Sequence, residues 1–155
     1  MDQAKKDFVL SGCIPLFKKL QPDTTARWGK MNAQQMLEHV AVVFVISAGK
    51  IKLDLATPAE HLPKYQEFLF SEKEFRENTK APAAILGEEP LPLRYATIEG
   101  AKEKLAEAIA LFENYFAADP EKRTMHPAFG ELNYEEWVLA HYKHVRHHLK
   151  QFGML

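Results

Sequence analysis

The segment from Met36 to Ala48 is apolar apart from two strongly polar residues, Glu38 and His39. Asn32 precedes this segment and Gln35 follows three positions later, which is the capping box that begins many helices. A helix that is apolar around most of its circumference must be covered by other parts of the protein. The segment therefore predicts the central helix of a helical domain.

Three further segments carry the apolar periodicity of helices. The four predicted helices run from about Lys5 to Leu20, Asn32 to Gly49, Thr97 to Ala118 and Tyr134 to Phe152. Gly12 and Pro15 predict a kink in the first helix, and Asn133 with Glu136 forms a capping box before the last. Because no alternating strand pattern is recognisable, we predict an all-α fold, a four-helix bundle of antiparallel helices.

A long crossover joins the second and third predicted helices. Thr57 to Glu60 forms a capping box with Pro58 at the first helical position, and Ser71 to Glu74 gives a similar signal, so short helices are expected at both places. The chain from Lys80 to Pro92 carries three prolines and one glycine and predicts a long loop over the bundle. Loops on a rigid scaffold usually carry specificity, so we expect the stretch from Ile51 to Pro92 to govern substrate selectivity.

Composition and charge narrow the classes of function. The 155 residues suit a single domain over residues 1–155, and 20 basic against 21 acidic side chains argue against nucleic-acid binding. A lone cysteine, Cys13, cannot form an intramolecular disulfide, which favours a cytoplasmic protein. The charged N-terminal residues are unlike a signal peptide, and the longest apolar stretch, Val40–Ala48, is too short to span a membrane. We therefore expect neither a secreted nor a membrane protein.

Four of the seven histidines lie between His141 and His148. On a helical wheel, His148 lies about 20° and His144 about 60° from His141, beside the apolar face. His147 falls toward the opposite, charged face and is predicted to be exposed to solvent.

His144 and His148 are spaced i, i+4, so both imidazoles can reach one metal ion. Alone this pair is a weak signal, because histidines at a helix edge are often surface or core residues. His39 strengthens it, since a buried imidazole on an apolar helix needs a partner. A hydrogen bond within the core would satisfy His39, and so would a metal shared with the other two.

Two other histidines are candidates for an additional ligand or for the lining of a pocket. His141 lies on the face of His144, but it is about 10 Å along the axis from His148, so His141 and His148 should not both bind one ion. His126 precedes a proline and either caps the local backbone or lines the pocket. The spacing lacks the glutamate of an HExxH zinc protease, and Cys13 in its apolar run is expected to be inert packing.

Three motifs in order resemble the DinB/YfiT-like superfamily, in a branch of uncharacterised bacterial proteins. They are WGKMNAQQMLEHV (Trp28 to Val40), HPAFGELNYEEW (His126 to Trp137) and HYKHVRHHLKQFG (His141 to Gly153). The resemblance implies a four-helix bundle, often a homodimer, that holds a divalent metal through three histidines. Matched residue by residue, these are His39, His144 and His148. Some members are thiol-dependent S-transferases or hydrolases, and others have no known activity.

The sequence thus leaves two interpretations. In the first, three neutral histidines hold Zn, Ni, Mn or Fe and leave a position open to activate a thiol or water for a small-molecule substrate. Trp28, Met36 and Trp137 are then expected to form apolar pocket walls, and Glu38 or Asn32 to accept hydrogen bonds from the ligands. In the second, the bundle is non-catalytic and the metal is structural or absent.

Overall fold

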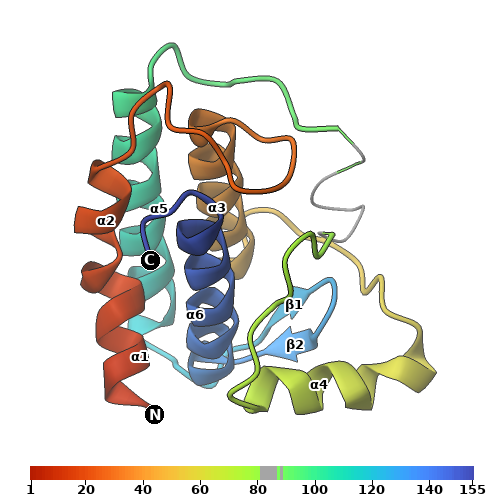
Figure 1. Cartoon of the computed structure of the whole chain (residues 1–155). Coiled ribbons are helices and arrows are strands. Elements are labelled where there is room, and N and C mark those ends of the chain that lie inside the picture. The colour runs from red at the N-terminus through yellow and green to blue at the C-terminus, as the bar shows by residue number, and fades with distance from the viewer. Residues whose placement is uncertain (81–86, 88) are drawn as a thin grey trace.

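The computed structural model describes residues 1–80, 87 and 89–155. This part of the chain is mostly helical, with three long helices and an N-terminal helical segment packed side by side (Figure 1). In chain order the elements are α1 (Gln3–Asp7), a π-helical turn (Phe8–Gly12), α2 (Ile14–Lys18), α3 (Ala33–Ser47), a 3₁₀ turn (Ala59–His61), α4 (Leu62–Phe70), α5 (Ile98–Ala117), β1 (Thr124–His126), β2 (Gly130–Leu132) and α6 (Tyr134–Gln151).

The starts of the three long helices agree with the capping signals in the sequence. The side chains of Asn32 and Gln35 exchange hydrogen bonds with each other's backbone N–H at the start of α3. Asn133 and Glu136 do the same for α6, and Thr97 accepts a backbone N–H at the start of α5. The predicted kink in the first helix is a π-helical turn, and Pro15 lies in the first turn of α2, where no hydrogen-bond donor is needed.

Helices α3 and α5 run in the same direction, although antiparallel helices were predicted. The backbone N–H of Tyr95, just before α5, donates to Glu38 near the start of α3 at 3.1 Å. At the other ends of the two helices, a Cβ on Gly49 would lie 3.1 Å from Tyr115 Oη. A crossover as long as this one can return the chain to the end where α3 began, and this makes the pair parallel. Helix α6 is antiparallel to α3, because His39 meets His144 whereas Ser47 meets His141.

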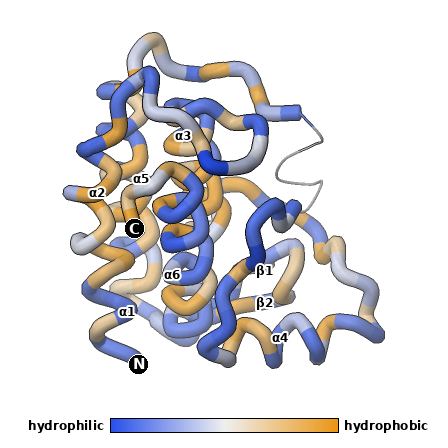
Figure 2. Tube along the Cα trace, viewed as in Figure 1, coloured by the Kyte–Doolittle hydropathy of each residue, from blue (hydrophilic) through white to orange (hydrophobic). Residues whose placement is uncertain are grey.

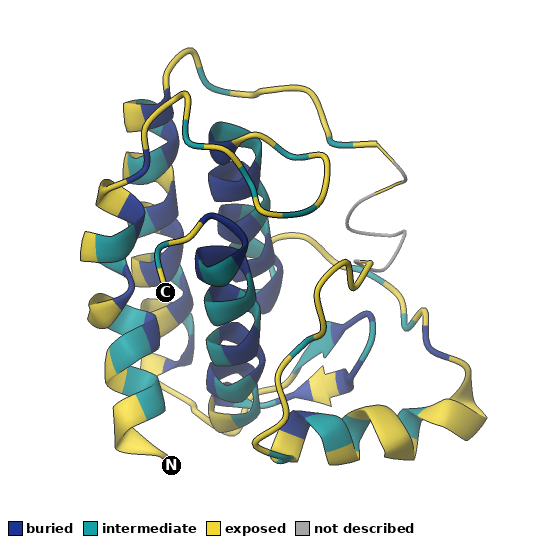
Figure 3. Cartoon of the chain, in the orientation of Figure 1, coloured by how far each residue is buried: buried dark blue, intermediate teal, exposed yellow. Residues whose placement is uncertain are grey.

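The core lies between these helices. Figure 3 shows α3 buried around most of its circumference, as its composition predicts, whereas α4 is largely exposed. Hydrophobic residues gather where the helices face one another (Figure 2). The largest fully buried side chains include Trp137, Phe44, Phe112, Phe116, Leu20, Met36 and Leu37. Within the described ranges, no helix combines the length and apolarity that crossing a membrane requires.

The crossover differs from the sequence prediction in two details. Thr57 does not cap a helix; its Oγ1 donates to the carbonyl of Ala128 at 2.9 Å, and the helical turn begins at Ala59. Ser71 ends α4 and begins no new helix. Much of the loop predicted from Lys80 to Pro92 lies outside the described residues.

A small antiparallel hairpin also departs from the all-α prediction. Thr124 pairs with Leu132, and His126 pairs with Gly130. Strands of three residues are too short to display an alternating pattern, so periodicity does not predict them.

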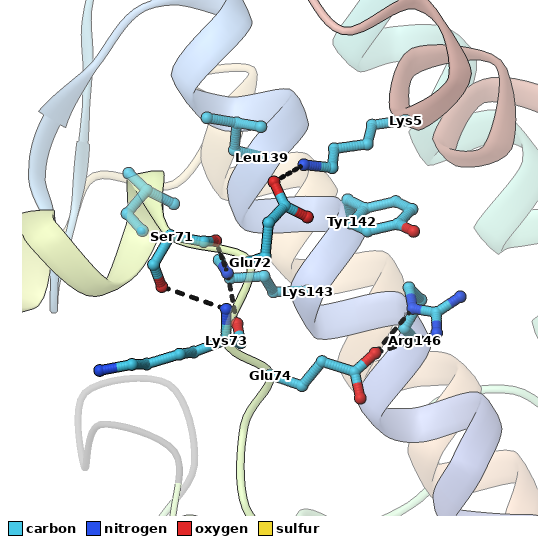
Figure 4. A pocket seen from close by; sticks show the side chains of 10 residues that line it. Lys5, Ser71, Glu72, Lys73, Glu74, Leu139, Tyr142, Lys143 and Arg146 are labelled. Atoms are coloured by element: carbon cyan, nitrogen blue, oxygen red, sulfur yellow. Dashed lines mark hydrogen bonds and ion pairs between the residues drawn. The ribbon is translucent and has the colours of Figure 1, made fainter.

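The segment after α4 is tied to α6 across a cavity of about 200 Å³ (Figure 4). The buried Lys143 ammonium donates to the carbonyl oxygens of Ser71, at 2.6 Å, and of Lys73. Ion pairs hold the same segment: Lys5 with Glu72, and Arg146 and Lys150 with Glu74.

A buried polar cluster of Ser47, Thr124, Trp137 and His141 joins α3, β1 and α6. Ser47 Oγ donates to the Phe44 carbonyl at 2.7 Å, so it accepts a hydrogen bond from His141 Nε2 at 3.0 Å. Thr124 Oγ1 likewise donates to the Ser47 carbonyl and accepts from Trp137 Nε1, both at 2.8 Å. These bonds fix the position of α6 along the axis of α3.

Glu38 anchors the far end of the crossover. Its buried carboxylate accepts the backbone N–H of Arg94 at 2.8 Å and of Tyr95 at 3.1 Å, and the amide of Gln34 at 3.1 Å. We expect Glu38→Ala to lower the free energy of unfolding by about 2–4 kcal/mol, because hydrogen bonds to a charged group are lost and backbone donors are left unpaired. Denaturant unfolding measures this, with the exposed Glu103→Ala as control. Equal stabilities of the two variants would contradict the anchoring role.

Two buried histidines should make the fold sensitive to acid. Burial lowers the pKa of His126 from 6.5 to about 3 and lowers that of His141 well below 6.5. Between these values and pH 6.5, the unfolded chain binds protons that the folded chain does not. The free energy of unfolding therefore has its full value above pH 6.5 and falls as the pH drops toward 3. Each histidine lowers it by about 1 kcal/mol between pH 7 and 5.5.

The pH dependence can be assigned by substitution. Denaturant unfolding between pH 5.5 and 7.5 should show a smaller change for His126→Asn than for the unaltered protein, because one titrating group is removed. The exposed His61→Asn should keep the original change. If both variants match the unaltered protein, the burial of His126 does not affect acid stability.

Candidate metal centre

His39, His144 and His148 come together between α3 and α6. His39 Nε2 lies 2.9 Å from His144 Nε2, which in turn lies 3.0 Å from His148 Nε2. The three rings meet edge to face, with centroids 4.6–5.0 Å apart. The i, i+4 spacing on α6 supplies two of the imidazoles, and the antiparallel packing of α3 supplies the third.

All three imidazoles are held neutral. Burial lowers the pKa of His39 to about 4. Burial, followed by the neighbouring imidazoles, lowers the pKa of His144 and His148 well below the ordinary 6.5. Neutral imidazole is the form that binds metal, so no proton has to be displaced from a charged ring at neutral pH.

The nitrogen positions fit a divalent transition metal. Two imidazole nitrogens bound at about 2.1 Å to one ion lie about 3.4 Å apart at the tetrahedral angle of zinc and about 3 Å apart at the right angle of octahedral coordination. The observed separations of 2.9 and 3.0 Å are close to the right-angle spacing and about 0.5 Å shorter than the tetrahedral one. Imidazole donors suit Zn, Cu, Fe and Ni better than calcium or magnesium.

The two additional candidate ligands lie elsewhere. His141 Nε2 donates to Ser47, and its ring stacks on Phe44. His126 Nδ1 accepts the backbone N–H of Ala128 and Phe129 at 3.0 and 3.2 Å, so it caps the hairpin turn. Across residues 1–80, 87 and 89–155, no fourth histidine, cysteine, aspartate or glutamate joins the three.

The expected pocket walls are separated in the structure. Trp28 lies near the centre, with its ring 5.5 Å from His147. Met36 is buried in the core one turn before His39, whereas Trp137 belongs to the polar cluster around Ser47. His147 is half-buried between Trp28 and Phe75, although the sequence predicted it to be exposed. Phe75, in the segment after α4, covers His147, which the helical wheel alone places in solvent.

Gln151 was missed by the sequence analysis. Its side chain lies 2.7 Å from His148 Nδ1, whereas Glu38 binds the crossover and Asn32 caps α3. The one signal for Gln151 was its spacing of three residues from His148, on the same helix face.

Cys13 offers no reactive thiolate. It is fully buried, and its Sγ donates to the Val9 carbonyl at 3.3 Å. Burial raises the pKa of this thiol to about 12, so it stays protonated at neutral pH.

The sequence of the chain matches a known protein family over most of its length. A family model described as the DinB superfamily matches residues 15–152, which include both helices that carry the three histidines. No curated protein and no solved structure gives a significant match. Because the family match spans most of the chain, the protein belongs to the DinB superfamily.

Proposed function

We propose that His39, His144 and His148 bind one divalent transition metal, Zn, Ni, Mn or Fe, in a metal-dependent transferase or hydrolase. The observation that carries this proposal is that three neutral imidazoles converge. His144 Nε2 lies 2.9 Å from His39 Nε2 and 3.0 Å from His148 Nε2. When bound, such a metal lowers the pKa of a coordinated water or thiol and so supplies a nucleophile near neutral pH.

An open site is favoured over a purely structural one. A structural zinc is usually closed by four protein ligands, whereas a catalytic one keeps a position for water or substrate. His141 and His126, the side chains best placed in the sequence to close the site, are hydrogen-bonded elsewhere. A structural metal between α3 and α6 would usually have a fourth protein ligand, and among the described residues no further histidine, cysteine, aspartate or glutamate joins the three.

The chain's own residues would bind and orient the reactants. Desolvation keeps the three imidazoles neutral, so the full charge of a bound ion acts on its other ligands. Trp28 and Phe75, the rings on either side of His147, provide apolar surface beside the centre. We propose a small-molecule substrate in the cytoplasm, with a low-molecular-weight thiol as co-substrate on family resemblance, and a homodimer as the assembly.

Metal content tests the ligand set. Protein prepared without a histidine tag should carry about one transition-metal ion per chain, and His144→Ala should reduce this to near zero because its Nε2 lies between the other two. His147→Ala is the matched control, on the same helix and beside His148. It should keep its metal. Equal metal contents in both variants would refute the assignment.

Activity separates the enzyme from the structural alternative. Protein loaded with Zn²⁺, Ni²⁺, Mn²⁺ or Fe²⁺ should support thiol transfer, or amide or ester hydrolysis, and His144→Ala should abolish it. A loaded protein that stays inactive with every coordination position filled by side chains would establish the structural role.

A further inference from the structure

Gln151, the last residue of α6, connects two segments far apart in the sequence. It is only 3% exposed and lies one turn after His148. Its Nε2 lies 2.9 Å from the carbonyl oxygen of Trp28, and its Oε1 lies 2.7 Å from His148 Nδ1. One amide therefore bridges the loop before α3 and a residue of the histidine triad.

The direction of these hydrogen bonds follows from the chemistry of the groups. The Trp28 carbonyl can only accept, so the NH₂ of Gln151 must face it and Oε1 must face His148. Because Oε1 also only accepts, His148 Nδ1 carries the proton. A neutral imidazole has one N–H, so the lone pair of His148 is on Nε2, which points to His144.

The loop is shaped to receive this amide. Arg27 N–H donates to the backbone carbonyl of Gln151 at 2.7 Å. Gly29 has φ +82°, a conformation that favours glycine, and a Cβ there would lie 2.7 Å from Gln151 Nε2. A side chain at position 29 would make the amide shift and would strain the backbone at this positive φ, so glycine suits the bridge.

We infer that Gln151 is a positioning residue: it holds His148 as the Nδ1–H tautomer with Nε2 directed to the metal, and Gly29 leaves the space for it. The inference rests on the proposed function in taking His148 as a ligand. His144 Nδ1 is buried with no partner among the described residues, so its ring receives no such constraint from its second nitrogen. Of the two imidazoles on α6, His148 is thus the one whose second nitrogen is held by a side chain.

Nitrogen-detected NMR of the metal-free protein tests the tautomer directly. The unaltered protein should show His148 protonated at Nδ1, and Gln151→Leu should lose this preference. Gln151→Glu should retain it, because a carboxylate still accepts from Nδ1, although it no longer donates to the Trp28 carbonyl. Gln66→Leu is the matched control, since it removes a glutamine whose amide donates to the Phe129 carbonyl away from the triad. Zn²⁺ affinity, from competition with a chelator, should fall 10- to 100-fold in Gln151→Leu and stay within twofold in Gln66→Leu.

Gly29→Ala gives a second route if Gln151→Leu does not fold, because it leaves the amide and the imidazole in the chain. It should also weaken the Nδ1–H preference and Zn²⁺ binding. An unchanged tautomer and affinity in Gly29→Ala and Gln151→Leu would overturn the inference. If the unaltered protein binds none of Zn²⁺, Ni²⁺, Mn²⁺ and Fe²⁺, the proposed function fails, and the tautomers of the variants still decide whether Gln151 positions His148.

Discussion

The interface between α3 and α6 buries imidazoles that must find partners inside the protein. An unpaired polar group in a core costs about 1–3 kcal/mol, so each of these rings constrains the register of the two helices. His141 meets Ser47 at one end, and His39 meets His144 toward the other. A slip of one helical turn would break both contacts together. The apolar residues around them stabilise the packing, and the polar ones determine which packing is adopted.

The two groups of polar residues in the core differ in how their hydrogen-bonding atoms are paired. The cluster around Ser47 is almost closed: its hydroxyls and the Trp137 indole all donate to a neighbour, and His141 donates through Nε2, whereas His141 Nδ1 has no partner among the described residues. In the histidine triad, three Nε2 atoms face one another. Either a proton shared between two of them or a bound cation is needed to offset the repulsion between their lone pairs. The cluster around Ser47 contributes to folding, whereas the triad is suited to an external ligand.

Local sequence signals were enough to predict the starts of the long helices and the three histidines of the candidate metal centre. The capping boxes at Asn32 and Asn133 mark helix starts through contacts three residues apart, and these were correct. The i, i+4 pair and the half-buried position of His39 on α3 also follow from helix periodicity. The parallel direction of α3 and α5, the half-burial of His147 and the role of Gln151 depend on segments distant in the sequence. Trp28 and Gln151 were each within a recognised motif, but no local pattern shows that one donates to the other.

The long separation between His39 and His144, 105 positions along the chain, has a consequence for how the centre forms. Closing so large a loop costs conformational entropy, which the packing of α3 against α6 has to offset. A chain that has made only α6 holds two of the three imidazoles and lacks the third. Under the proposed function, metal binding by all three imidazoles would therefore require the completed tertiary structure, and a bound ion would favour the native chain over its partly folded states.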